Sequence, residues 1–278
     1  MNIRAQRPGR IVLRYLLLLA VLAISIGPFL WQLSTSLKGV GEDIYSYPPQ
    51  FVPSEPTARN YARVADVVPV WGFALNSLLV AVANVAANCV GAALAGYALA
   101  RMRFFGRKFV VLAFVLALLV PGESIMISLF LMMRSMQLSN TLLAVVLPGA
   151  VSALNVLLMR NAFAGLSYAV EEASLIDGAN AWQRFTRIAL PSVKGTIAVV
   201  AIFSFMFSWD DFLWPLIVLH DPDKYTLTIG LNYLQGTFAS DQRLIAAGTI
   251  IAVAPLILMF LALQKYFFRG VGAGAVKG

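Results

Sequence analysis

Six long apolar runs constrain this chain more than any other feature of its sequence. A helix that crosses a bilayer needs about 20 mostly apolar residues. The chain offers such runs at about residues 11–33, 73–99, 109–132, 142–159, 195–218 and 244–267. Of its 278 residues, 60% are hydrophobic and only 12% are charged, about half the charged share of an average soluble domain. The sequence therefore predicts an all-α membrane protein with six transmembrane helices, and it excludes a disordered chain or a disulfide scaffold.

The basic residues predict which ends of these runs face the cytoplasm. Cytoplasmic loops of membrane proteins carry an excess of Lys and Arg. With the N-terminus inside, 15 of the 21 Lys and Arg residues fall on the cytoplasmic side, and six spans place both termini there. The net charge of +8 is then a topology signal, and nucleic-acid binding is not expected. The first run is longer than the 7–15 apolar residues of a typical signal peptide, so we expect a retained helix.

The links between the runs divide the chain further. We expect a cytoplasmic N-terminus at 1–10, a transmembrane permease domain at 11–267 and a cytoplasmic tail at 268–278. Outer links are expected at about 34–72 and 219–243. Five prolines in the first outer link disfavour regular helix, and this link forms either a structured cap or a docking surface: Pro48, Pro49, Pro53, Pro56 and Pro69. In the second run, Ala92, Gly96 and Ala100 recur every four positions, which predicts close helix packing.

The long cytoplasmic link at about 160–194 contains the signals of two short helices. Ser167 can cap the first helix and Gly178 ends it. Asn180 with Gln183 predicts a capping pair that opens the second helix, which Pro191 is expected to stop. By itself this pattern fits a passive anchor on the membrane surface.

The residue types in this link and the spacing between them give a more specific signal. Glu172-Ala173-Ser174 is followed after three residues by Gly178, and after nine more by Ile188, one residue and Leu190-Pro191. This spacing resembles the EAA loop of ABC importer permeases, with Ser174 in place of the second alanine. Tyr97-Ala98-Leu99-Ala100-Arg101, Trp209-Asp210-Asp211-Phe212 and the C-terminal Gly274-Ala275-Val276-Lys277-Gly278 resemble the carbohydrate-uptake branch, in particular the smaller permease of maltose-type importers.

The resemblance implies a type I ABC importer permease fold and a transport subunit that is not itself an enzyme. The chain lacks a phosphate-binding G-x-x-x-x-G-K-[ST] loop, so ATP and Mg²⁺ would be used by partner subunits and no cofactor is expected on this chain. The implied partners are a second permease, two ATPase subunits, an extracytoplasmic solute-binding protein and a sugar, in a bacterial or archaeal inner membrane.

The resemblance also implies residue roles. The residues implied to contact an ATPase subunit are Glu171, Glu172, Ala173, Ser174, Asp177, Gly178, Ile188, Leu190 and Pro191. The resemblance implies a weaker contact of the C-terminal tail with the ATPase, through Arg269 and Lys277. Independently, charge within a span is costly and marks function. Candidates for the substrate path are therefore Glu123, Asp210 and Asp211, although Asp210 and Asp211 alternatively form a cap at the outer interface. Asn84 and Asn88 share a face of the second span and either line the path or form interhelical hydrogen bonds. Glu123 follows the helix-breaking Pro121-Gly122 pair, where the third span is expected to unwind.

Several alternatives stay open at this point. A permease of the same superfamily for a non-sugar solute also fits the sequence. Only the motifs that resemble the carbohydrate-uptake branch argue against it. A secondary transporter requires charges near the bilayer midplane and an inverted repeat, neither of which is evident. An intramembrane enzyme is disfavoured, since Asp210 and Asp211 are adjacent and the chain has one Cys and one His. A metal site is accordingly not expected.

Overall fold

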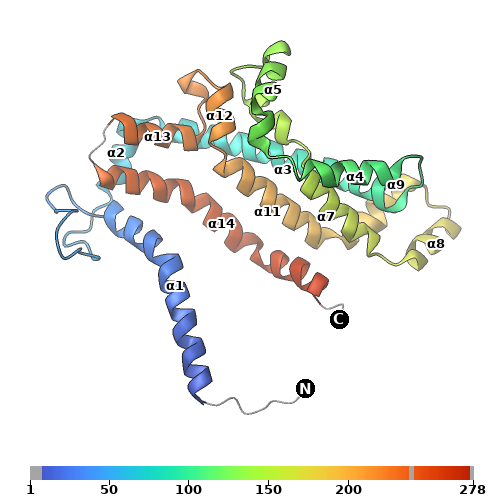
Figure 1. The fold of residues 1–278 in the computed structure, drawn as a ribbon, viewed down its shortest axis with the longest axis horizontal. Helices are drawn as coiled ribbons and strands as arrows, with labels where there is room; N and C mark the ends of the chain where they lie inside the picture. Colours follow the sequence, from blue (N-terminus) through green and yellow to red (C-terminus); the bar gives the residue numbers. More distant parts are fainter. Residues whose placement is uncertain (1–7, 238–240, 276–278) are drawn as a thin grey trace. The chain divides into compact units, whose positions relative to one another are not determined.

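Residues 8–237 and 241–275 are described by a computed structural model, in which they form helices and links without a β-strand. The all-α prediction is confirmed. The chain forms two compact units: Met1–Pro69 with Leu231–Val253, and Val70–Gly230 with Ala254–Gly278. Figure 1 shows the helices by label.

The helices follow one another along the chain with short breaks. In order they are α1 (Pro8–Ser36), α2 (Arg59–Val67), α3 (Val70–Arg101), α4 (Arg107–Ala117), α5 (Gly122–Ser135), α6 (Leu142–Val146), η1 (Leu147–Gly149), α7 (Ala153–Ala164), α8 (Tyr168–Ile176), α9 (Ala181–Gln183), η2 (Arg184–Ala189), α10 (Leu190–Ser192), α11 (Lys194–Asp210), α12 (Leu213–Val218), η3 (Pro222–Lys224), α13 (Leu227–Thr237) and α14 (Gln242–Ala275).

Both continuous helices and bent pairs of helices are long and apolar enough to cross a bilayer. Three helices are long and apolar enough to cross a bilayer, at Ile11–Ser36, Val70–Arg101 and Gln242–Ala262. Three bent helix pairs meet the same test, which gives up to six spans among the described residues. The predicted count of six equals this upper value and stays a prediction.

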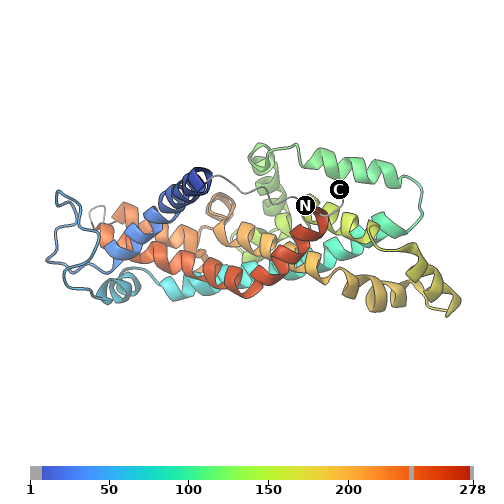
Figure 2. The same cartoon turned by 90° about the horizontal axis from the view of Figure 1, so that it is seen from below.

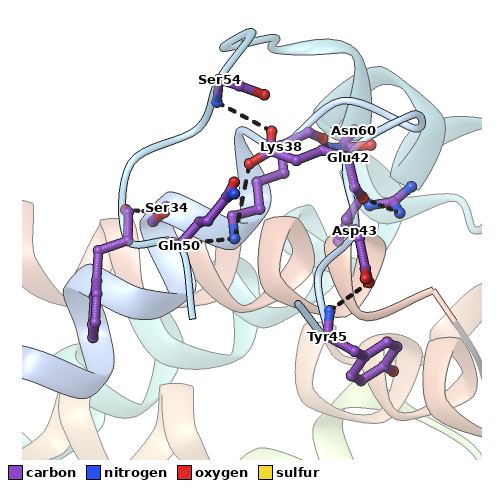
Figure 3. Close-up of polar contacts among 10 residues, drawn as sticks. Ser34, Lys38, Glu42, Asp43, Tyr45, Gln50, Ser54 and Asn60 are labelled. Atoms are coloured by element: carbon purple, nitrogen blue, oxygen red, sulfur yellow. Dashed lines mark hydrogen bonds and ion pairs between the residues drawn. The ribbon is translucent and has the colours of Figure 1, made fainter. Parts of the chain in front are cut away.

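The outer link after α1 folds into a defined structure in the first unit. Lys38 is 1% exposed, and its Nζ donates to the Gln50 carbonyl at 2.7 Å and lies 5.1 Å from the centre of the Trp31 ring. The Glu42 carboxylate lies 3.9 Å from the same Nζ (Figure 3). Asn60 donates to the Ser36 and Lys38 carbonyls, each at 2.9 Å. These contacts tie the proline-rich segment to the end of α1.

The same unit corrects one detail of the sequence prediction. The prolines keep residues 48–56 out of helix, but α2 forms between Pro56 and Pro69, where no proline interrupts it. Arg63 of α2 pairs with Asp241 at 3.0 Å. The outer link is therefore partly helical.

The second unit is built around α3, against which α7 and α11 pack (Figures 1 and 2). Close approach is possible because of the small residues on α3. Ala92, Gly96 and Ala100 are buried, as the four-residue spacing predicts. A Cβ on Gly96 would lie 2.7 Å from the Met159 Cβ and 2.8 Å from the Arg160 backbone nitrogen, so α7 is the neighbour that requires a glycine.

Two of the predicted runs are broken by sharp bends. The run at 109–132 consists of α4 and α5, which meet at 104° after Pro121 sets the extended backbone before α5. This break at Pro121-Gly122 was predicted. The run at 142–159 bends by 45° between η1 and α7, and α7 continues to Ala164, so the following link begins later than predicted.

The run at 195–218 is not one helix, which corrects the expectation of a continuous fifth span. Helix α11 ends at Asp210, Asp211 is extended with ψ of 121°, and α12 begins at Leu213. The second outer link also differs, because it contains the unpredicted helix α13. Asp221-Pro222-Asp223 forms a turn in which the Asp221 side chain accepts from the Asp223 N–H at 3.1 Å.

Candidate functional site

The segment from residue 165 to 193, called the α8 segment below, has the local structure that its capping residues predict. The Ser167 Oγ accepts from the Ala169 N–H at 3.3 Å and opens α8. Gly178 follows with φ of +77°, a left-handed conformation that favours glycine. Asn180 and Gln183 cap the next helix reciprocally, each bond measuring 2.9 Å. The predicted pair of short helices joined at Gly178 is confirmed.

Helix α8 presents an exposed mixed surface. Its apolar residues Leu175 and Ile176 are 52% and 87% exposed. Among the predicted contact residues, Glu172, Ala173, Asp177 and Gly178 are exposed, whereas Ser174 is buried. The side chains of Glu171 and Arg269, and all of Lys277, lie outside the described residues. Exposed apolar groups beside carboxylates on a short rigid helix form a surface that suits a protein partner.

The end of the α8 segment differs from the prediction that Pro191 stops the second helix. A π-helical turn, η2, leads into α10, which contains Pro191 and extends to Ser192. The chain bends by 77° between Ser192 and Lys194. Proline is tolerated here because it occupies the first turn of α10. Ile188 and Leu190 are half-buried, and Leu190 packs against the core around α3.

Arg101, the last residue of α3, holds the beginning of the α8 segment. Its Nε and Nη2 donate to the Phe163 carbonyl at 3.0 and 2.7 Å, and Nη2 also donates to the Leu166 carbonyl. Its guanidinium carbon lies 4.3 Å from the centre of the Tyr168 ring. One side chain thus caps the C-terminal end of α7 and stacks on the first residue of α8.

An aromatic cluster holds the other end of the segment. Tyr97 of α3 contacts Phe163 of α7 with ring centres 5.4 Å apart and Phe185 of η2 at 5.1 Å. The Trp182 and Phe185 rings contact each other at a tilt of 42°, with their centres 5.5 Å apart. Aromatic pairs at these distances stabilise packing beyond area burial. Both ends of the α8 segment are therefore fixed to the same end of α3.

A polar cavity of about 400 Å³ lies elsewhere in the second unit, lined by residues of α3, α5, α6, η1, α7, α11 and α12 and of two links, at Ser152 and Asp211. Its lining residues include Asn84, Asn88, Gly122, Glu123, Ser152, Asn155, Ser204, Phe207, Ser208, Asp211 and Trp214. A cavity with apolar walls and several convergent polar groups is the usual form of a small-molecule site.

Asn88 organises one wall of this cavity. Its Nδ2 donates to the Gly149 carbonyl at 2.7 Å, and its Oδ1 accepts from the Ser152 N–H at 2.9 Å and from Asn155 Nδ2 at 3.0 Å. The Asn155 amide also donates to Ser204 Oγ at 3.0 Å. These bonds join α3, α7 and α11, so Asn88 and Asn155 serve helix packing as well as lining the cavity.

Two carbonyl oxygens in the cavity wall lack donors. Asn84 Nδ2 donates to Ser208 Oγ at 3.0 Å, but the Asn84 Oδ1 and the Asn155 Oδ1 are buried and meet no hydrogen-bond donor among the described residues. Buried polar atoms in proteins are normally satisfied. Because both oxygens are buried, neither is open to a molecule in the cavity, and the polar groups that a ligand can reach are other atoms of the lining.

Of the three acidic candidates, two line the polar cavity and one is not among its described lining residues. Glu123 lies in the first turn of α5 and lines the cavity. Asp211 lines it from the α11–α12 break, and its carboxylate accepts from the Trp214 N–H at 3.4 Å. Asp210 is exposed and is absent from the described lining. Four of the five predicted path residues thus meet at one cavity: Asn84, Asn88, Glu123 and Asp211.

Other lining residues were missed by the sequence prediction. Asn155 is a single amide in an apolar run, the same signal that identified Asn84 and Asn88, and it could have been found. Ser204 and Ser208 lie four residues apart on α11, a weaker signal. Among the described residues, no group of His, Cys, Asp and Glu is arranged to hold a metal ion.

The comparisons with known proteins agree with this architecture. Residues 68–273 match a protein family described as "binding-protein-dependent transport system inner membrane component". The chain belongs to this family. Its fold resembles the crystal structure of a bacterial ABC transporter involved in the import of the acidic polysaccharide alginate. The TM-score is 0.82 at 23% identity, over 96% of this chain and 100% of the other. The fold is that of an ABC importer permease.

Two curated relatives are named as transport system permeases. The arabinooligosaccharides transport system permease protein AraQ of Halalkalibacterium halodurans is 34% identical over 82% of each chain. The lactose transport system permease protein LacG of Rhizobium radiobacter is 30% identical over 96% of each chain. Likeness over this much of the chain makes the present protein a transport permease.

Proposed function

We propose that this chain is one of two permease subunits of an ATP-driven, binding-protein-dependent sugar importer and that α8 is its ATPase-coupling helix. The observation that carries the proposal is the α8 segment. The EAA spacing begins on the exposed short helix α8, which ends before Gly178, and continues through the α8 segment, which contacts α3 through Tyr168 and Phe185. A passive surface anchor would not require two separate attachments to the core.

The contacts between the α8 segment and α3 connect the surface of α8 mechanically to the polar cavity. A partner that binds the exposed surface of α8 would move Tyr168, and the stacked Arg101 would carry that displacement to the end of α3. The contact between Tyr97 and Phe185 carries it in parallel. Because α3 lines the polar cavity through Asn84 and Asn88, a rigid-body shift of α3 would change the cavity.

The cavity favours a neutral saccharide as the transported solute. Its lining offers amide and hydroxyl groups and the aromatic Trp214, which together suit a hydroxyl-rich ring. Glu123 and Asp211 add negative potential, and no Lys or Arg is among the described lining residues. An acidic sugar would therefore meet like charges. Names such as those of AraQ and LacG support the sugar class.

The remaining parts of the proposal concern assembly. A second permease would complete the pore, two ATPase subunits would bind ATP and Mg²⁺, and an extracytoplasmic binding protein would deliver the sugar to the outer links at 34–72 and 219–243. The protein would lie in the inner membrane as one permease domain at 11–267, with both termini and the 160–194 link in the cytoplasm. Glu171 would join the α8 contact, and Arg269 with Lys277 would form a secondary contact.

The deciding experiment is uptake by the reconstituted complex. Proteoliposomes containing both permeases, the ATPase subunits and the binding protein are supplied with labelled neutral oligosaccharides, with or without internal ATP. We expect accumulation only with ATP and binding protein. Uptake that requires a proton or sodium gradient instead would indicate a secondary transporter. Uptake of a non-sugar solute alone would keep the importer and reject the sugar.

A further inference from the structure

A second cavity, of about 730 Å³, lies at the link between α3 and α4, in the second unit. It is lined by Arg103, Phe104, Phe105, Gly106, Arg107, Lys108, Phe109, Val111 and Arg160. None of these residues lines the polar cavity. The mechanism proposed above uses none of their side chains, so this cavity is a separate feature of the molecule.

The cavity is strongly cationic. Arg103, Arg107, Lys108 and Arg160 contribute four positive charges, and the described lining contains no Asp or Glu. None of the four forms an ion pair with a described residue. Like charges gathered without a counter-ion repel one another, so the cavity attracts an anion that would relieve this repulsion.

Hydrogen-bond donors in the cavity are left unused. The Nε of Arg160 is buried and has no acceptor among the described residues, while its Nη1 donates to Asn161 Oδ1 at 3.2 Å. Gly106, with φ of +80°, precedes α4, and no side chain caps the first N–H groups of that helix. The uncapped N–H groups at the start of α4 fit a ligand with several oxygen acceptors and negative charge, such as a phosphate group, whereas the buried Arg160 Nε is not open to the cavity.

The rest of the lining is apolar and aromatic. Phe104, Phe105 and Phe109 are all exposed, Phe105 completely so. Helix α4 has no buried residue, and it also exposes Leu112 and Leu116. A free inorganic anion would leave these groups in contact with water. A ligand that carries both an anionic head and hydrocarbon chains would cover both kinds of surface.

We propose that this cavity binds the headgroup of an anionic phospholipid, with its phosphodiester against Arg107, Lys108 and Arg160 and its acyl chains along the phenylalanines of α4 and the preceding link. The site would anchor the α3–α4 link to the membrane next to the end of α3, from which Arg101 holds the α8 segment. The proposal depends on the family's membrane location and is independent of the transported solute.

The test is lipid titration of the purified complex in non-ionic detergent, followed by native mass spectrometry. The probes are phosphatidylglycerol, phosphatidylcholine and inorganic phosphate. We expect one tightly bound phosphatidylglycerol per chain, at least tenfold weaker phosphatidylcholine, and no displacement by millimolar phosphate. Each cation near an anionic headgroup is worth a factor of about five in affinity. The double variant Arg107→Gln/Lys108→Gln should therefore bind phosphatidylglycerol about 25-fold more weakly, and Arg160→Gln about fivefold.

The matched control is Arg187→Gln/Lys194→Gln, which removes two exposed charges that are outside the described lining. It should change affinity by less than twofold. An equal loss in this control would mean that diffuse charge attracts the lipid and would overturn the proposal. So would equal binding of phosphatidylcholine, or phosphate binding that displaces the lipid. Cross-linking of Lys108 to an acidic segment of another subunit, with lipid excluded, would reassign the cavity to that partner.

Discussion

The guanidinium of Arg101 stacks on the ring of Tyr168, with 4.3 Å between the guanidinium carbon and the ring centre. Arg101 is the last residue of α3, and Tyr168 is the first residue of α8. The same guanidinium is held by the Phe163 and Leu166 carbonyls, so its orientation is fixed by α7. The contact therefore joins α3, against which α7 and α11 pack, to the largely exposed helix α8.

Replacement of Tyr168 by leucine should lower the coupling between ATP hydrolysis and uptake. A cation–π contact at an exposed site contributes about 0.5–1 kcal/mol, which corresponds to a two- to fivefold change in the ratio of sugar imported to ATP hydrolysed. Tyr168→Phe keeps the aromatic face and should match the wild-type ratio. The measurement is that ratio in proteoliposomes. Equal ratios for the Leu and Phe variants would show that the stack transmits nothing.

The left-handed Gly178 should be essential for coupling but tolerant of a small side chain. Proline fixes φ near −65°, whereas Gly178 has φ of +77°, so Gly178→Pro must reorient α8 relative to the following helix. We expect normal membrane insertion, ATP hydrolysis that no longer drives uptake, and weaker co-purification of the ATPase.

Gly178→Asn provides the control, because asparagine is comparatively tolerant of the left-handed region and a Cβ here meets no atom within 4 Å. This variant should keep most uptake. Glu172→Lys, which reverses an exposed charge on α8 without changing the backbone, should lose coupling in the same way as proline. If both Gly178→Pro and Glu172→Lys import sugar at the wild-type rate, α8 does not contact the ATPase.

Local signals in the sequence predicted much of this segment, whereas its attachments were beyond reach. Ser167, Gly178 and the Asn180–Gln183 pair act within a few residues of themselves, and each was predicted. Arg101 donates to carbonyl oxygens of residues 62 and 65 positions later in the chain. Every residue has a backbone carbonyl, so the sequence does not indicate which of them a distant side chain binds. The break at Pro121-Gly122 was predicted from residue type. The break at Asp211 was not predicted, although Pro215 lies four residues later and cannot donate to the Asp211 carbonyl, which accepts from Thr228 Oγ1 at 2.8 Å instead.

The packing of α3 on α7 should fail when Gly96 gains a side chain. A Cβ at this position would lie 2.8 Å from the Arg160 backbone nitrogen, and backbone cannot move aside as a flexible side chain can. Overpacking of this kind costs about 1–3 kcal/mol. Gly96→Ala should therefore lower the melting temperature of the detergent-solubilised protein. Gly195→Ala, where the space is open, should leave it unchanged or raise it slightly.

Removal of the Lys38 charge should loosen the outer link. Lys38 and Glu42 have side chains only 1% and 7% exposed, so Lys38→Met leaves a buried carboxylate without its cation. Breaking a buried pair in this way costs about 3–5 kcal/mol. We expect faster hydrogen exchange in residues 37–58. Lys224→Met removes one member of an exposed pair, Lys224–Asp221, with side chains 42% and 39% exposed, and should have almost no effect on exchange.

The charge of Glu123 should set the preference for neutral over acidic sugars. Glu123 lines the polar cavity, whereas the neighbouring acid of the α11 end, Asp210, is exposed and outside its described lining. Glu123→Gln keeps a hydrogen-bonding oxygen and removes the negative charge, so uptake of neutral oligosaccharide should fall by less than about threefold. Competition by a uronic-acid oligosaccharide should strengthen by about tenfold, because a like charge is gone. Asp210→Asn should alter neither value. If Asp210→Asn changes the competition as strongly as Glu123→Gln does, the sugar does not pass along this cavity.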